Sequence, residues 1–438
     1  MPAWQGSVSG TMVASDFTAT ADFCVSDSSE IQVPPASGVT TAPTSSAMTA
    51  PERRASLSLA FIFALRMLGL FLVLPVFALE ARKYPGGEDA GAVGLAMGIY
   101  GLTQAFLQMP YGMASDRYGR KRVIVVGLLV FALGSLVAAA ATSLNGLMLG
   151  RALQGMGAVS AAVTALLADQ TRDEVRTKAM ALVGGSIALM FALSLVLAPL
   201  LVSVVGLSGI FVVTATLALS GVAVVLWVSP PEPTKHQDAG RGSWSEVLLN
   251  PALLRLNLGV FVLHAVQVAM WLAVPALLVQ AGLAKEHHWW IYLPAVLASF
   301  LVMGGTLFPM ERRGYLRAVF LGAVALIALV QLGFWWMGSG APSLVPLSVL
   351  LFLFFCGFNV LEASQPSMAS RLAPAHARGT ALGVYNTLQS LGFFIGGLAG
   401  GLLLKNLGVQ ALFAACGCAM LVWLVLAWPM IATGRKAP

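Results

Sequence analysis

Long stretches without a single charged residue dominate the pattern of this chain. Five of them are 26 to 29 residues long and lie at 90–115, 123–150, 256–284, 379–404 and 406–434. Two others, at 179–231 and 318–361, are longer still. An α-helix needs about 20 mostly apolar residues to cross the hydrocarbon core of a bilayer. Each shorter stretch therefore predicts one membrane-spanning helix, and each longer one predicts two.

Turn sequences divide the two longer stretches. They read "VGLSG" at 205–209 and "GSGAPS" at 338–343, and such clusters of glycine, proline and serine end helices and form turns. Three further apolar segments surround Arg66, follow Arg151 and cover 289–310. The pattern therefore predicts an all-α membrane protein with twelve transmembrane helices.

Composition and charge agree with this prediction. Hydrophobic residues make up 58% of the chain and charged residues only 10%, which excludes an ordinary soluble domain. If the N-terminus is cytoplasmic, 19 of the 25 Lys and Arg residues fall in cytoplasmic segments. Positive residues resist translocation, so we expect both termini in the cytoplasm of a bacterium and the chain in its inner (plasma) membrane. The net charge of +7 then needs no nucleic-acid partner.

The N-terminal segment 1–54 differs from the rest. Residues 1–52 are rich in Ser, Thr, Ala and Pro and contain no Lys or Arg, which predicts a disordered tail. Met48 precedes a short basic sequence before the first span. We therefore expect one of two translation starts, Met1 or Met48, and N-terminal sequencing of the native protein distinguishes them.

An internal repeat with an offset near 200 residues divides the spans into two sets of six. "KAMAL" at 178–182 matches "RGTAL" at 378–382, and Asp116, Arg117 and Gly119 have counterparts in Glu311, Arg312 and Gly314. Parallel repeats of this kind place a substrate site near the bilayer midplane, between two halves that rock about it. We predict an N-terminal half at 55–229, a cytoplasmic linker at 230–252 and a C-terminal half at 253–434.

The loop between the second and third predicted spans carries a specific motif. "YGMASDRYGRKR" at 111–122 contains Gly112, Asp116, Arg117, Gly119, Arg120 and Lys121 in the spacing G-x-x-x-D-R-x-G-R-K. With this motif the chain resembles the major facilitator superfamily of transporters. The resemblance implies a conformational latch, in which Asp116 faces the start of span eleven near Gly379 and Thr380, and Arg120 bridges Asp116 to Asp169. The alternative is a solvated loop that only sets orientation.

Two arginines lie inside predicted spans, where an unpaired charge is costly and a functional role is the default expectation. "GRALQGMGA" at 150–158 resembles the span-four motif of the superfamily, with Arg151, Gln154, Gly155 and Gly157 matching. That resemblance implies that Arg151 takes part in proton coupling, and Arg66 in span one is a second candidate. For each, the alternative is a buried structural clamp on ion-pair or carbonyl partners.

The branch of the superfamily is indicated by longer stretches. "RMLGLFLVLPVFAL" at 66–79 and "FNVLEASQPSMASRLAPAHARGTALGVYNTLQ" at 358–389 resemble the YajR-like branch of drug:proton antiporters. In span five, Gly185 and Pro199 match the antiporter pattern, whereas Ser194, Ala198 and Val202 depart from it. The resemblance implies proton-coupled efflux of a small amphipathic molecule. A uniporter or proton symporter for a metabolite and a non-transporting membrane sensor are the alternatives.

Glu362 is the only carboxylate that the sequence places well inside a span. Low dielectric favours its protonated form, which suits a group that takes up and releases a proton during transport. We therefore predict that Glu362 is the proton carrier. A substrate ligand and a structural partner for a cation are the alternatives.

Polar residues recur at helical spacing within several spans and predict a substrate cavity, because unsatisfied polar groups are costly in lipid. The candidates are Tyr100, Gln104, Gln108, Gln154, His264, Gln267, Trp271, Asn359, Tyr385 and Gln389. Hydrogen bonding between helices without any ligand is the alternative. The five His residues show no metal-binding spacing and no nucleophile motif is present, so we expect no enzyme, metal or cofactor. The expected partners are a small-molecule substrate, protons and the lipid bilayer, and we expect a monomer.

Overall fold

The computed structural model describes residues 47–157, 159–232, 244–374 and 377–430. Every regular element in these ranges is helical. The elements are α1 (Ala50–Phe71), α2 (Leu74–Glu80), the short helix η1 (Ala81–Lys83), α3 (Ala90–Tyr118), α4 (Arg120–Ala139), α5 (Leu144–Met156), α6 (Ser160–Asp169), α7 (Asp173–Ala223), η2 (Val224–Val228), α8 (Trp244–Leu248), α9 (Pro251–Gln280), η3 (Lys285–His287), α10 (Trp289–Arg312), α11 (Leu316–Met337), α12 (Leu344–Leu372) and α13 (Arg378–Ala427).

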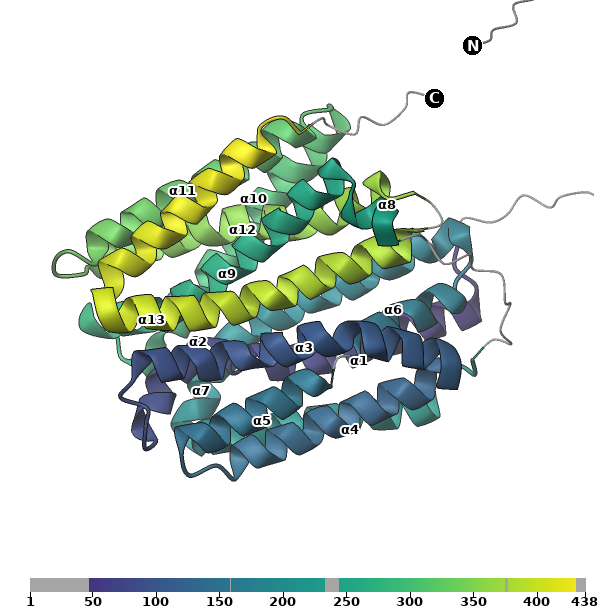
Figure 1. Cartoon of the computed structure of the whole chain (residues 1–438), viewed down its shortest axis with the longest axis horizontal. Helices are drawn as coiled ribbons and strands as arrows, with labels where there is room; N and C mark the ends of the chain where they lie inside the picture. Colours follow the sequence, from purple (N-terminus) through teal and green to yellow (C-terminus); the bar gives the residue numbers. More distant parts are fainter. Residues whose placement is uncertain (1–46, 158, 233–243, 375–376, 431–438) are drawn as a thin grey trace, which may run out of the picture. The chain divides into compact units, whose positions relative to one another are not determined.

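The described helices confirm the predicted fold class. Ten helical segments of the described chain are long and apolar enough to cross a bilayer, and two of these, α7 and most of α13, are about twice the usual length. Each of the two reverses direction at a glycine with positive φ, Gly206 at 67° and Gly408 at 82°. Each therefore supplies two spans, and the segments together make twelve. Figure 1 shows α1–α7 in its lower part and α9–α13 in its upper part, which we call the N-terminal and C-terminal halves.

The same glycine device recurs in the two halves. Gly119 separates α3 from α4 with φ 102°, and Gly314 separates α10 from α11 with φ 84°. A side chain is strained at such φ values, whereas glycine is not. The repeat read from the sequence thus has a counterpart in backbone geometry.

Two element boundaries differ from those expected. α1 begins at Ala50, five residues before the predicted start of the first span, because Thr49 and Glu52 form a capping box that satisfies free N–H groups. Most of the predicted tail, residues 1–46, lies outside the described residues. In the predicted linker, Trp244–Leu248 form helix α8, and α9 already begins at Pro251, where Asn250 caps the free N–H groups.

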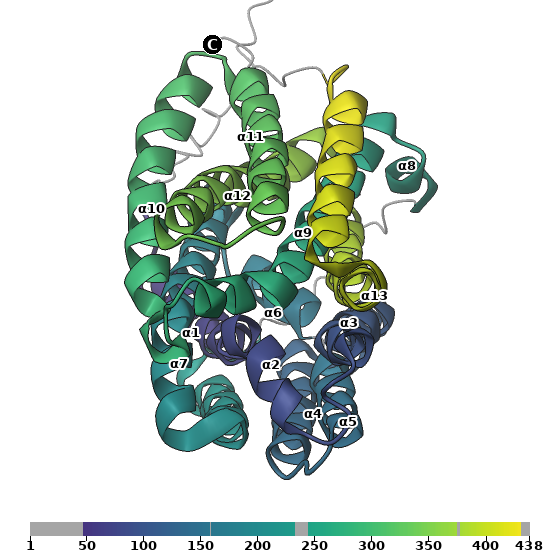
Figure 2. The ribbon, with the colours of Figure 1, turned by 90° about the vertical axis from the view of Figure 1, so that its left-hand side faces the viewer.

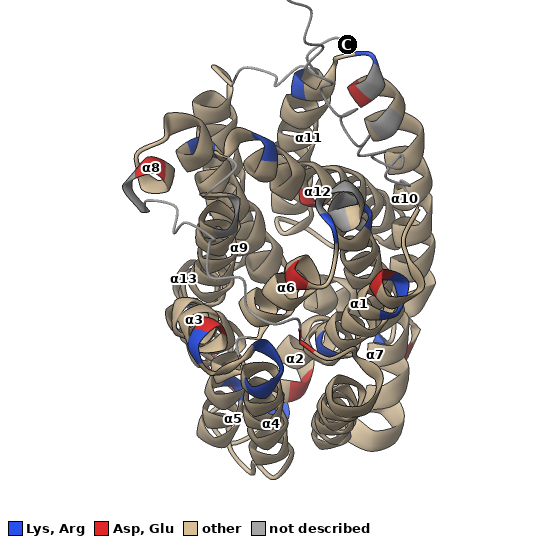
Figure 3. Ribbon diagram, turned by 90° about the vertical axis from the view of Figure 1, so that its right-hand side faces the viewer, with Lys and Arg blue, Asp and Glu red and all other residues tan. Residues whose placement is uncertain are grey.

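The two ends of the helix bundle are named here after the predicted orientation. The inner end carries residues 116–122 and α8 and faces the viewer in Figure 3. The outer end carries the turns at Gly206 and Gly408 and faces the viewer in Figure 2, where α2 lies beside α9 and α3 beside α13.

Close packing joins the two halves toward the outer end. A Cβ added at Gly94, Gly98 or Gly101 of α3 would overlap the backbone of α13, and one added at Gly397 or Gly401 would overlap α3. Small residues allow such close backbone contact between membrane helices. The halves therefore meet at backbone distance along this part of α3 and α13.

Candidate functional site

Arg66 of α1 lies fully inside the N-terminal half. Its guanidinium donates to the Ser160 hydroxyl at 3.0 Å and to the Tyr100 hydroxyl at 2.8 Å, and it lies 5.9 Å from the centre of the Phe131 ring. Hydroxyl and aromatic partners lower the cost of burying the charge. Arg66 is thus held by α3, α4 and α6 of its own half.

Arg151 of α5 is buried beside the same tyrosine. It donates to the Gln154 side chain at 3.0 Å and to the Met97 carbonyl at 3.3 Å, and its guanidinium lies over the Tyr100 ring at 4.9 Å. Gln154 in turn donates to Ser135 at 2.8 Å. Among the described residues neither Arg66 nor Arg151 has a carboxylate within ion-pair distance. The two arginines and Tyr100 therefore form one network, which we call the arginine cluster.

Glu362 of α12 lies in the C-terminal half beside two other predicted residues. His264 Nε2 of α9 lies 3.2 Å from one carboxylate oxygen, and Gln389 of α13 donates to the other oxygen at 3.5 Å. The Gln389 amide nitrogen is also 2.8 Å from His264 Nε2. The His264 side chain is 3% exposed, whereas that of Glu362 is 35% exposed. We call these three residues the carboxylate cluster.

The hydrogen bonds of His264 indicate which of its ring nitrogens carries a hydrogen. Its Nδ1 lies 2.8 Å from the Val260 carbonyl, which can only accept, so Nδ1 carries a hydrogen. In a neutral imidazole the other nitrogen, Nε2, then carries only a lone pair. An ionised carboxylate beside that lone pair would be repelled. The Gln389 amide, 2.8 Å away, can donate to this lone pair and satisfies His264 as a neutral ring. The Glu362 oxygen, 3.2 Å away, would form a hydrogen bond with His264 only with an additional proton on the carboxyl group or on the ring.

The remaining polar candidates are distributed over several contacts. Tyr385 donates to Gln365 at 3.4 Å, next to the carboxylate cluster. Asn359 instead donates to Ser299 of α10 at 2.8 Å. Trp271, predicted on the same face as His264, stacks edge-on against Tyr292 with ring centres 5.4 Å apart. These residues thus contact different neighbours, and their lining of one substrate cavity stays a prediction.

Three buried glutamines complete the predicted set. Gln104 and Gln108 of α3 and Gln267 of α9 are all almost fully buried. Within the described structure both amide atoms of Gln108 and the carbonyl oxygen of Gln104 have no hydrogen-bond partner. Unsatisfied buried amides are costly, so these two side chains of α3 are suited to meet a ligand or water.

Aromatic rings that the sequence reading did not single out link the two halves beside the carboxylate cluster. The ring centre of Phe191 of α7 lies 6.0 Å from that of Phe355 and 6.1 Å from that of Phe358, both of α12. Phe358 and Phe393 contact the His264 ring edge-on at 6.0 Å and 5.0 Å. A spacing of three or four residues along α12 was the available sequence signal, but the same spacing is ordinary in a helix core.

At the inner end, Arg120 contacts both carboxylates named for the latch. Its guanidinium forms an ion pair with Asp116 and a second one with Asp169 at 3.0 Å. Lys121 donates to the Ser229 carbonyl at 2.7 Å, and the Arg117 guanidinium lies 5.4 Å from the Tyr118 ring centre. Gly119 needs its positive φ, while Gly112 has ordinary space around it. The predicted contact of Asp116 with the start of α13 stays a prediction.

The structure adds Glu232 to this loop. Its carboxylate accepts from the backbone N–H groups of Arg120 and Lys121, which begin α4. These N–H groups have no partner within the helix, and a carboxylate there also interacts favourably with the helix dipole. Since Glu232 is 111 residues from Lys121 in the chain, no local sequence signal could have revealed the contact.

Comparison with known proteins decides the family. The model of the Major Facilitator Superfamily matches residues 59–397 and again 310–438. The chain belongs to the Major Facilitator Superfamily. It is therefore a membrane transporter rather than an enzyme.

Three known proteins show what the chain is similar to. It is 42% identical over 383 residues to the inner membrane transport protein YajR of Escherichia coli (strain K12), covering 86% of this chain and 84% of that protein. It is 28% identical over 384 residues to the multidrug resistance protein MdtH of Aeromonas salmonicida (strain A449), covering 84% and 90%. The human organic anion transporter MFSD10 has a similar fold, with a TM-score of 0.65, 19% identity and coverage of 86% and 100%.

Proposed function

We propose that the protein exports a small amphipathic molecule across the bacterial inner membrane in exchange for protons, by alternating access. The observation that carries this proposal is the position of Glu362 inside a span, where its Oε2 lies 3.2 Å from His264 Nε2 and is buried without a hydrogen-bond partner among the described residues. A transporter driven by a proton gradient needs a group that is charged in one state and neutral in another. The partly exposed carboxyl group of Glu362, inside a span, meets this need.

The distribution of charge supports the same proposal. Arg66 and Arg151 are buried and held by hydroxyl, amide, carbonyl and aromatic groups of their own half. We propose that they keep the N-terminal wall of the cavity rigid and couple to the proton only through the movement of the halves. Direct proton coupling by either arginine stays a prediction that their variants test.

The names of the relatives support an export role. The similar proteins include one named an inner membrane transport protein and one named a multidrug resistance protein. We propose the same membrane for this chain, with both termini in the cytoplasm and the protein acting as a monomer. A uniporter or a proton symporter of the same fold is the alternative, and the direction of proton-driven movement distinguishes them.

At the inner end we propose that Asp116, Arg120 and Asp169 act as the latch of the outward-facing state. The two ion pairs of Arg120 and the attachment of the loop by Glu232 hold the loop of the N-terminal half in one shape, which supports its use as a docking surface when the inner end closes. Exposed ion pairs are individually weak, so the latch depends on the loop geometry as much as on charge.

The decisive experiment compares Glu362→Gln with the unchanged protein in vesicles with an imposed pH gradient. A panel of amphipathic compounds first identifies a transported substrate. Glutamine mimics the protonated carboxyl group, so we expect no gradient-driven accumulation, but normal substrate binding and normal exchange of labelled for unlabelled substrate.

The matched control is Glu311→Gln, which removes a carboxylate that is paired with Arg371 at the inner end, outside the carboxylate cluster. We expect it to retain gradient-driven transport. Uphill transport by the Glu362→Gln protein would show that another group carries the proton. Loss of all substrate binding would make Glu362 a substrate ligand instead.

A further inference from the structure

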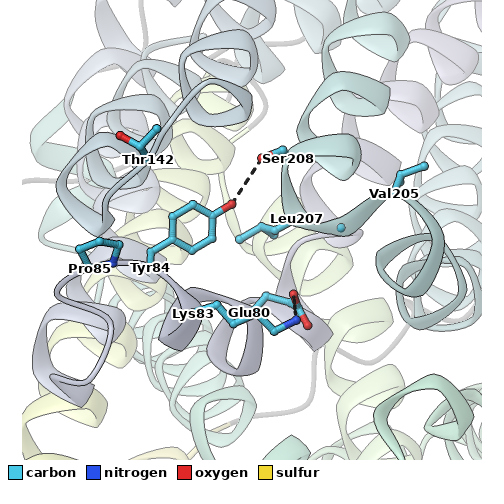
Figure 4. Close-up of a pocket in the computed structure, with 9 residues that line it drawn as sticks. Glu80, Lys83, Tyr84, Pro85, Thr142, Val205, Leu207 and Ser208 are labelled. Carbon is cyan, nitrogen blue, oxygen red and sulfur yellow. Dashed lines mark hydrogen bonds and ion pairs between the residues drawn. The ribbon is translucent and has the colours of Figure 1, made fainter.

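A buried carboxylate at the outer end connects the two halves. Glu80, the last residue of α2, has a side chain that is 5% exposed. One of its oxygens accepts from Lys83 of its own half at 2.7 Å, and the other accepts from Lys285 of the C-terminal half at 2.6 Å. Figure 4 shows Glu80 and Lys83 paired at the edge of a surface pocket that Tyr84 and Ser208 also line. Glu80 thus uses its two oxygens for different halves.

Asp89 repeats this arrangement on the other helix pair that meets at the outer end. Its Oδ1 accepts from the backbone N–H groups of Gly91 and Ala92 at the start of α3, and its Oδ2 accepts from Lys405 of α13 at 2.7 Å. Again one oxygen serves the carboxylate's own half and the other serves a lysine of the opposite half.

The shared arrangement has a physical consequence. A carboxylate that loses its only partner on opening would be left unpaired, which is costly when it is buried. Glu80 and Asp89 each keep a partner in their own half when the opposite lysine leaves. The pairs can therefore hold the outer end closed without making its opening prohibitive.

We propose that Glu80, Asp89, Lys285 and Lys405 form an outer clasp that stabilises the closed outer end and releases when the transporter turns outward. The clasp joins the two halves at two places on the outer end. Glu80 connects α2 to the segment that follows α9, and Asp89 connects α3 to α13. It holds together the glycine contacts of α3 with α13, which bring these helices to backbone distance.

The two pairs differ in strength. The Glu80 and Lys285 side chains are 5% and 29% exposed, whereas those of Asp89 and Lys405 are 42% and 48% exposed. Solvent screens the second pair more strongly. The hydrogen bond from Lys405 lowers the pKa of Asp89 below its ordinary value. Partial desolvation opposes this lowering, and the N–H groups of Gly91 and Ala92 add to it. The pair of Asp89 and Lys405 therefore contributes its full stability above the ordinary pKa of aspartate and loses it as the pH falls through the lowered pKa.

The test measures the distance across the outer end in purified protein, without substrate or pH gradient. Spin labels are attached at Thr142→Cys in the N-terminal half and Ser339→Cys in the C-terminal half, both in exposed turns of the outer end, after the native cysteines have been replaced. Lys285→Gln should raise the ratio of open to closed outer ends about tenfold. Lys405→Gln should raise it about threefold, because its pair is exposed.

Lys83→Gln is the matched control, since it removes the partner of Glu80 that belongs to the same half. It leaves Glu80 without a partner in the open state, so it should lower the ratio of open to closed outer ends rather than raise it. Unchanged distances in both Lys285→Gln and Lys405→Gln, or equal opening in Lys83→Gln, would overturn the clasp. Because this readout needs no transport, its result does not depend on whether Glu362 carries the proton.

Discussion

The two halves share a fold but treat buried charge in opposite ways. In the N-terminal half, Arg66 and Arg151 are each held by two or more groups and share the Tyr100 side chain. In the C-terminal half, Glu362 is partly exposed, and its Oε2 lies beside His264 without a hydrogen-bond partner among the described residues. Several partners hold each guanidinium in place, although the Nε atoms of Arg66 and Arg151 are buried without a partner among the described residues. A group with changing charge must instead be free to alter its contacts. Under the proposed function, the comparison contrasts a rigid half with a titrating half.

The largest expected effect concerns the rigid half. Arg151→Ala removes a buried guanidinium from Gln154, Met97 and the Tyr100 ring, and we expect it to lower the free energy of unfolding by about 3 kcal/mol. Arg151→Lys should restore only part of this, because lysine lacks the planar fork of arginine. Thermal unfolding in detergent measures both variants.

A milder variant in the same cluster provides the control. Tyr100→Phe removes only the hydroxyl that accepts from Arg66 and keeps the ring under Arg151, so it should cost about 1 kcal/mol. If Arg151→Ala were as stable as the unchanged protein and lost only gradient-driven transport, Arg151 would belong to the coupling machinery and the contrast between the halves would fail.

An intermediate effect is expected in the titrating half. His264→Gln keeps a hydrogen-bonding side chain but cannot be protonated, so under the proposed function Glu362 would lose a neighbour that can take up a proton. We expect about tenfold slower proton-driven transport and a shifted pH profile, with little change in stability. Gln267→Asn, a buried amide change on the same helix outside the cluster, should leave the pH profile unchanged. An unaltered profile in His264→Gln would assign the proton to Glu362 alone.

The smallest effect is expected in the loop that joins the second and third spans of each half. Asp116→Asn weakens one ion pair of Arg120, whereas Glu311→Gln weakens the corresponding contact with Arg371. We expect the first to reduce the outward-facing population about threefold and the second to leave it unchanged. Crosslinking across the inner end measures this, and equal responses would show that the loop is not specialised in the N-terminal half.

The features predicted from the sequence are those that depend on the order of residues along the chain alone. Bilayer thickness sets span length, so the twelve spans and the break at 205–209 followed from counting apolar residues. Rarity of charge in lipid similarly drew attention to Arg66, Arg151 and Glu362. These predictions needed no knowledge of how the helices pack.

The contacts between helices could not be predicted in this way. Whether His264 faces Glu362 or Trp271 faces the cavity depends on how each helix is rotated against its neighbours. Ser135 and Ser160 were missed because serine hydroxyls commonly bond to the carbonyls of their own helix and carry no distinctive signal. The roles of Glu80 and Asp89 also depend on partners far away in the chain.

The turns at Gly206 and Gly408 bear on how the chain enters the membrane. Each replaces a connecting loop by a single residue with positive φ, so the helices on either side are continuous with the turn. We expect such a pair to insert as one hairpin during synthesis, and it offers almost no loop to a protease or an antibody at the outer end. An added Cβ would meet no atom within 4 Å at either glycine, yet the positive φ penalises any side chain there. The constraint at these two positions therefore comes from the path of the backbone and not from lack of space.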